Sequence, residues 1–157
     1  MLRFPHKQIR AKCIKEYMAA AGYDRAVCFS CGNAADALEA EGVDVVHIGE
    51  RGLLTPNRWM HKSEIDKVFH GYFDATSGHL PVELMVMIGK AFRQHLGSME
   101  EETIYIPTGS GETLVCLKMA YPDKRMVAVY NLDKATEYDQ EAPLNRLVEL
   151  LAEEIIK

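Results

Sequence analysis

The sequence has no segment suited to crossing a membrane, and it has few basic residues. No apolar run approaches the roughly 20 residues of a membrane-spanning helix, and residues 1–10 lack the apolar stretch of a signal peptide. We therefore expect a cytoplasmic protein without a membrane partner. Lys and Arg number 18 against 23 Asp and Glu, a formal net charge of −5. This balance argues against nucleic acid as the main partner.

Patterns that bind metal ions are also missing. The six histidines never pair as H-x-x-x-H or H-E-x-x-H, so the sequence predicts no metal site. Of the four cysteines, Cys28 and Cys31 form a C-x-x-C without a second such pair, which disfavours a zinc site. In a cytosolic chain we expect reduced, packed thiols. A thiol redox protein that uses Cys28 and Cys31 remains an alternative function.

The length and the apolar content of the chain suit one folded domain. Its 157 residues are 48% hydrophobic, which favours a packed core over a disordered chain. Helical and strand patterns alternate, which predicts a three-layer α/β/α fold with a mostly parallel sheet of about four strands. We expect a single α/β domain over residues 1–157. The predicted helices cover 7–21, 33–41, 63–69, 81–96, 112–120 and 143–156, and the predicted strands cover 25–29, 43–48, 103–107 and 126–130.

The order of the strands predicts where a ligand would bind. Right-handed crossovers between parallel strands favour the sheet order 2-1-3-4, which creates a topological switch point between the first and third strands. Ligands of open α/β sheets bind at the carboxyl ends of the strands beside such a point. The turns that follow these two strands are Ser30–Asn33 and Thr108–Thr113, so topology and polar composition select the same place.

The strongest motif is the turn Pro107-Thr108-Gly109-Ser110-Gly111-Glu112-Thr113, which follows a strand and opens a helix. Its glycines permit a tight turn with unobstructed N–H groups, and its hydroxyls add donors. The start of a helix carries a partial positive charge, so the expected ligand is a phosphate group. It is not a Walker motif, because no Lys follows the second glycine. The alternative is a plain strand-to-helix turn that only needs glycine.

Two further features are weak when each is taken alone. The turn Ser30-Cys31-Gly32-Asn33 could bind a carboxylate through its N–H groups, but Gly-Asn is also a common turn pair. Lys7 is the first residue of a predicted helix, and a lysine in such a place is usually a solvated side chain.

Together, Lys7 and the two turns resemble the fold type II pyridoxal-phosphate (PLP) enzymes. This tryptophan synthase β-like superfamily includes threonine synthase, cysteine synthase and the serine/threonine dehydratases. The resemblance implies that Lys7 forms the Schiff base with the cofactor. It implies that a substrate loop holds the substrate carboxylate and that Asn33 also contacts the phenolic oxygen of the cofactor. The substrate loop is Ser30, Cys31, Gly32 and Asn33, and the implied cofactor-binding loop is Thr108, Gly109, Ser110, Gly111, Glu112 and Thr113.

The resemblance covers residues 5–49 and 74–131, and the chain departs from the family in several ways. It is much shorter than full-length members, and Cys31 replaces the second Ser of the substrate loop. Nothing between Leu132 and Lys157 matches the Ser or Thr that contacts the pyridine nitrogen in the family.

A further departure concerns the helix that carries Lys7. Ile9 holds the place where the family often has Arg, and Arg10 comes next. Arg10 lies three residues from Lys7, on the same helical face. An amine must be neutral to attack an aldehyde, and a positive neighbour favours the neutral form. We therefore expect Arg10 to assist Lys7.

These motifs predict a PLP-dependent lyase- or transferase-like protein that acts on a small amino acid by β-elimination or replacement. A homodimer would complete the site that so short a chain leaves unfinished. The main alternative is a binding module, which would hold a phosphorylated small molecule, a phosphate or a sulfate in the same cleft without catalysis.

Overall fold

The computed structural model describes residues 2–29, 33–48, 68–70, 81–108, 111–130 and 148–156. The chain divides into two compact units. Unit 1 comprises Met1–His6 and Met85–Lys157, and unit 2 comprises Lys7–Leu84. Both contain helices and parallel strands, which confirms the predicted α/β class. The single domain over residues 1–157 stays a prediction.

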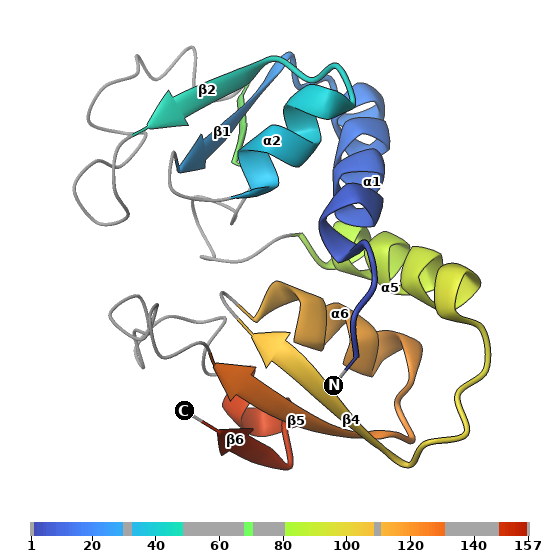
Figure 1. Cartoon of the computed structure of the whole chain (residues 1–157). Coiled ribbons are helices and arrows are strands. Elements are labelled where there is room, and N and C mark those ends of the chain that lie inside the picture. Colours follow the sequence, from blue (N-terminus) through green and yellow to red (C-terminus); the bar gives the residue numbers. More distant parts are fainter. Residues whose placement is uncertain are drawn as a thin grey trace. The chain divides into compact units, whose positions relative to one another are not determined.

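Unit 2 contains a three-stranded parallel sheet in the order β2-β1-β3. Strand β1 (Arg25–Phe29) lies between β2 (Val45–Ile48) and β3 (Val68–His70). Helix α2 (Asn33–Ala40) joins β1 to β2 and contacts both strands, as Figure 1 shows. A parallel pair requires such a crossover, since its strands run in the same direction. Helix α1 (His6–Ala21) precedes these elements.

The core of unit 2 follows from the apolar spacing of its helices. Ile14 and Met18 of α1 recur four residues apart, as the buried stripe of an amphipathic helix requires, and both are buried. Leu38 of α2 and Ala26 of β1 are buried as well. The predicted end of α1 is confirmed, because the helix stops before a glycine with positive φ, Gly22.

Unit 1 contains a second three-stranded parallel sheet, in the order β4-β5-β6. Its strands are β4 (Thr103–Thr108), β5 (Arg125–Tyr130) and β6 (Glu154–Ile156). Helix α6 (Glu112–Ala120) joins β4 to β5 and contacts both. Helix α5 (Val82–Leu96) comes before β4, and its residues from Met85 onward belong to this unit.

The predicted strand order 2-1-3-4 is wrong, although two of its three pairings are observed. β1 pairs with β2 and β4 pairs with β5, as predicted. The second edge of β1, however, pairs with β3 and not with β4. The helical pattern over 63–69 predicts helix for the first two residues of β3. Val68, Phe69 and His70 are too short a run for periodicity to distinguish strand from helix.

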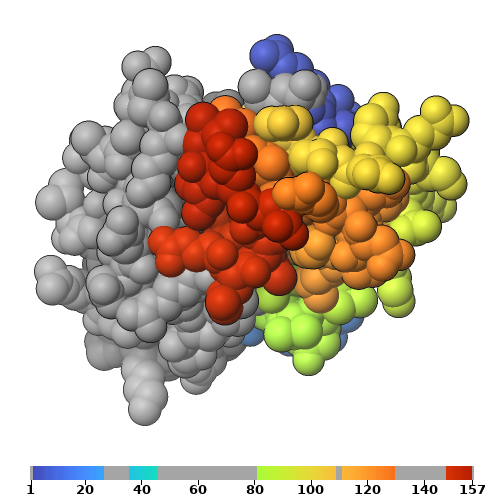
Figure 2. All heavy atoms as spheres, turned by 90° about the horizontal axis from the view of Figure 1, so that it is seen from below, coloured from blue at the N-terminus to red at the C-terminus, as the bar shows by residue number. Residues whose placement is uncertain are grey.

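The predicted C-terminal helix over 143–156 is wrong in its last part. Residues 148–151 are helical, and β6 then pairs with β5 through Glu154, Ile155 and Ile156. Figure 2 shows this terminal segment on the surface of unit 1, against residues 111–130. Leu150, which the helical pattern places on the buried side, is 80% exposed. Pairing with β5 overrides the helical pattern, which is the common way that tertiary context defeats local propensity.

Helices α5 and α6 of unit 1 pack at close range. A Cβ added at Gly89 of α5 would lie 2.9 Å from the carbonyl oxygen of Cys116 in α6. Glycine is therefore needed at this position for the two backbones to approach. Ile88 and Phe92 of α5 lie four residues apart on one helical face, and both are fully buried.

Candidate functional site

The predicted phosphate-binding turn ends at a left-handed glycine that starts helix α6. Gly111 is the N-cap residue, with φ 98° and ψ −6°. It has no side chain to cap the helix, so the first N–H groups of α6 donate no hydrogen bond to an N-cap side chain. These N–H groups and the helix dipole suit an anion. Gly109 and Ser110 of the same turn lie outside the described residues.

The two threonines of this turn are both buried, but their hydroxyls have different partners. Thr108 Oγ1 donates to the carbonyl oxygen of Ile106 at 2.8 Å. A hydroxyl has one proton, and in Thr108 this proton is already used in that hydrogen bond. Thr108 could therefore donate to a phosphate only through its backbone N–H. Thr113 Oγ1 lies 3.1 Å from Nδ1 of His6. The cofactor role of Thr108 and Thr113 stays a prediction.

Glu112, the first residue of α6, is fully buried. Its carboxylate lies at the positive end of the helix dipole, where a negative charge is stabilised. A negative charge on Glu112 would repel a bound phosphate, whereas a protonated Glu112 carboxyl would not. The contact between Glu112 and a cofactor stays a prediction.

The N-terminal segment of unit 1 fixes His6 beside α6. Leu2 N–H donates to the carbonyl oxygen of Tyr105 in β4 at 2.9 Å. The ring of Phe4 lies edge-on to Phe92 of α5, with 4.9 Å between centroids, and 5.7 Å from the ring of His6. Sequence reasoning gave His6 no role. No local signal could have found it, because Thr113 is 107 positions away.

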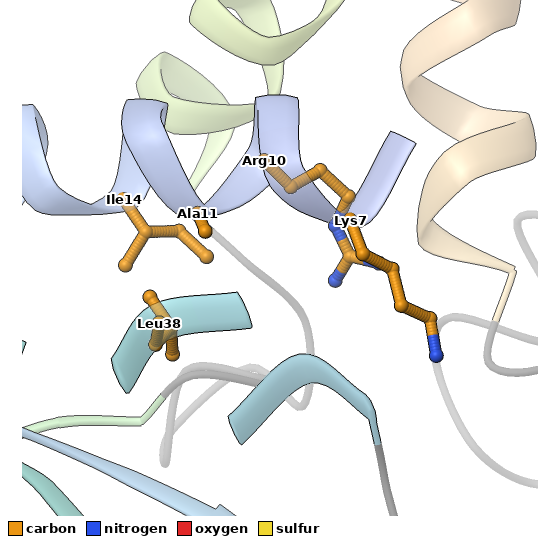
Figure 3. A pocket seen from close by; sticks show the side chains of 5 residues that line it. All are labelled: Lys7, Arg10, Ala11, Ile14 and Leu38. Carbon is orange, nitrogen blue, oxygen red and sulfur yellow. The ribbon is translucent and has the colours of Figure 1, made fainter. Parts of the chain in front are cut away.

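Lys7 follows His6 directly and is half-buried. In unit 2 it lines a small hollow with Arg10, Ala11, Ile14 and Leu38 (Figure 3). The expectation that Lys7 and Arg10 share one helical face is confirmed, and Arg10 is buried. Figure 3 shows the Lys7 side chain extending away from Ile14 and Leu38.

This hollow is not large enough to hold a cofactor. Its free volume is about 10 Å³, which is the space that a single water molecule needs. Its lining combines two basic side chains, Lys7 and Arg10, with the apolar side chains of Ala11, Ile14 and Leu38.

The predicted substrate loop is described only at its end. Asn33 begins α2, and Ser30, Cys31 and Gly32 lie outside the described residues. The premise that both turns leave one sheet is wrong, because β1 and β4 belong to different sheets. A ligand shared by the two turns therefore stays a prediction that rests on the family resemblance alone.

The cysteine chemistry can be assessed at two of the four positions. Cys13 and Cys116 are buried and form no disulfide. Burial, and secondarily the charge of Glu16, raises the pKa of the Cys13 thiol, so Cys13 is a poor nucleophile near neutral pH. Cys31 lies outside the described residues, and a redox role for Cys28 and Cys31 stays untested.

Comparisons of sequence identify no relative. No protein family model and no curated protein matches this chain. The fold is similar to that of a threonine deaminase. The match to the T.th. threonine deaminase covers 95% of this chain and 63% of that chain, with a TM-score of 0.57 and 13% identity.

A second match is to the processed form of threonine deaminase isoform 2 from Solanum lycopersicum. It covers 82% of this chain and 46% of that chain, with a TM-score of 0.48 and 18% identity. The chain thus spans less than two thirds of either solved protein. The likeness to the T.th. threonine deaminase is one of fold alone.

Two features are absent from the described residues. None of the described helices is both long and apolar enough to cross a membrane. Within the same residues, no group of three or more His, Cys, Asp or Glu side chains is arranged to hold a metal ion.

Proposed function

We propose that this chain binds PLP and acts as a lyase- or transferase-like protein on a small amino acid. The observation that carries the proposal is the start of α6. There a left-handed glycine leaves the first-turn N–H groups without a side-chain cap, at the end of a parallel strand. The fold likeness to threonine deaminase supports the same superfamily. The substrate is proposed only as a class, a small amino acid.

The residues at hand suit the chemical groups of PLP. Its phosphate needs donors, and the N–H groups after Gly111 and the Thr113 hydroxyl provide them. Its aldehyde needs an amine, and Lys7 follows the residue that contacts Thr113. When bound, PLP supplies an aldehyde for amines and a ring that accepts electrons from a carbanion.

Each group of this chain has a defined task in the proposal. Lys7 holds the cofactor through its Nζ and moves protons at the substrate. In this proposal the positive charge of Arg10 favours the neutral, reactive form of the Lys7 amine. The turn from Thr108 to Thr113 holds the phosphate, and the loop from Ser30 to Asn33 holds the substrate carboxylate.

Absorption spectroscopy tests the proposal directly. Adding PLP to the purified protein should produce a Schiff-base band that disappears on borohydride treatment. Lys7→Ala should abolish the band, since no other amine is assigned to the aldehyde. Lys12→Ala, which removes an exposed lysine of the same helix, is the matched control and should keep it.

Two outcomes would redirect the proposal. A band that persists in Lys7→Ala would show that PLP reacts elsewhere, and the proposal would fail. Stabilisation by phosphate compounds without any Lys7-dependent band would favour the binding module, in which the same turn holds a phosphorylated ligand without catalysis.

A further inference from the structure

His6 contacts the phosphate-binding turn from the opposite end of the sequence. Its Nδ1 lies 3.1 Å from Thr113 Oγ1, and its ring contacts the ring of Phe4. Phe4 is in turn held by Phe92, and Leu2 is held by the backbone of β4. The imidazole is therefore placed by a chain of contacts within unit 1 and reaches one of the residues assigned to the phosphate.

The direction of the hydrogen bond between His6 and Thr113 decides what Thr113 can do. A threonine hydroxyl has a single proton and two lone pairs. A sulfate or phosphate-ester dianion offers only acceptors, so it can use Thr113 only if that proton points toward it. When Nδ1 of His6 carries no proton, it accepts a hydrogen bond from the Thr113 hydroxyl. When Nδ1 is protonated, the ring donates and the hydroxyl proton is released for the anion.

We propose that His6 is a positioning residue of the phosphate site, because its Nδ1 proton directs the Thr113 hydroxyl toward a bound anion. The inference rests on the proposed function, since it needs an anion at the start of α6. Thr113 is the second residue of α6, and side chains of a helix tilt toward its N-terminus. Its hydroxyl therefore lies at the end of α6 where the anion would bind.

Anion binding should then depend on pH. An imidazole changes charge between about pH 5 and 8. The charged ring always donates from Nδ1 and adds a positive charge, whereas the neutral ring donates from Nδ1 in only one of its two tautomers. Affinity should therefore be highest at the acidic end of this range and fall as the pH rises. Among the described residues, the titratable or charged groups on the segments around His6 include Arg3 of the same segment, Lys7 and Arg10 of α1, Glu112 of α6 and His95 of α5, whose ring also contacts Phe4.

Inorganic sulfate is a suitable probe because it stays a dianion throughout this range. We expect calorimetric titration of the full chain to show affinity about tenfold weaker at pH 8.5 than at pH 6.0, the worth of one charge-assisted hydrogen bond. In His6→Asn the side-chain amide can donate at every pH, so the affinity should be retained and its pH dependence should flatten. Thr113→Val should weaken binding at both pH values, and Thr113→Ser should restore it.

The outcomes separate this inference from the proposed function. An equal pH slope in the wild type and in His6→Asn would overturn the role of His6 and leave the phosphate site intact. A flat, strong affinity in Thr113→Val would overturn it as well, because the hydroxyl would then have no part in binding. Absence of sulfate and PLP binding in the wild type would instead overturn the proposed phosphate site itself.

Discussion

Helices α6 and α2 each follow a parallel strand and a glycine in the sequence, but their described residues are buried to different extents. In α6 the residues from Gly111 to Leu117 are all buried. In α2 Leu38 is buried, whereas Asp36 and Glu39 are exposed. A helix start without a solvent face keeps its first N–H groups in a low-dielectric setting, where they attract an anion more strongly. A glycine before a helix is therefore not enough to predict an anion-binding site. The burial of the helix that follows must also be known.

The comparison is tested most strongly by truncating the core of α6. Leu114→Ala removes a fully buried side chain and should lower the free energy of unfolding by about 2–5 kcal/mol. Asp36→Ala, on the exposed face of α2, should change it by less than about 0.5 kcal/mol. Urea unfolding measures both. Similar losses for the two variants would mean that α6 is no more buried than α2.

A smaller effect is expected where α5 approaches α6. Gly89→Ala places a Cβ 2.9 Å from a backbone oxygen that cannot move alone, so we expect a loss of about 1–3 kcal/mol. Lys90→Ala, at the exposed next position, is the control and should be nearly neutral. A stabilised Gly89→Ala, as helix propensity alone would give, would contradict the close packing.

The left-handed start of α6 should matter to both stability and binding. Gly111→Ala forces a Cβ into a conformation that costs about 1–2 kcal/mol. It should also displace the N–H groups that the anion needs. Gly22→Ala carries the same backbone strain at the end of α1, in open space, and should destabilise without altering sulfate affinity. Equal sulfate affinity in the two variants would show that the anion does not bind at Gly111.

The smallest effect concerns the other end of α6. The Tyr121 hydroxyl donates a hydrogen bond to the carbonyl oxygen of Gly97. Tyr121→Phe should therefore lower the free energy of unfolding by about 1 kcal/mol. Burial raises the pKa of Tyr121 and the nearby Arg93 partly opposes this. A raised pKa in the folded state gives stability that is present at neutral pH and lost above the ordinary range near pH 10. The gap between wild type and Tyr121→Phe should therefore shrink in strong alkali.

Much of the fold was predictable because its signals are local. The strand before the phosphate turn and the helices α1, α5 and α6 follow their predicted bounds within a residue or two. Strands β3 and β6 were not predicted, since each is only three residues long and owes its form to pairing with a longer strand. Periodicity cannot reveal so short an element.

The candidate site was predictable in its chemistry and not in its connections. Glycine and hydroxyl residues identify the turn before α6, and spacing places Arg10 beside Lys7. The burial of Glu112 and the contact between His6 and Thr113 depend on how distant segments pack. The prediction from strand order failed for the same reason, because β3 took the edge that β4 was expected to occupy.

Reduction with borohydride in the presence of PLP, followed by peptide mapping, measures the central claim most directly. The account predicts one modified lysine, Lys7, and loss of that modification when inorganic sulfate or phosphate competes at the start of α6. A modification spread over several exposed lysines, or one that excess phosphate leaves unchanged, would contradict it.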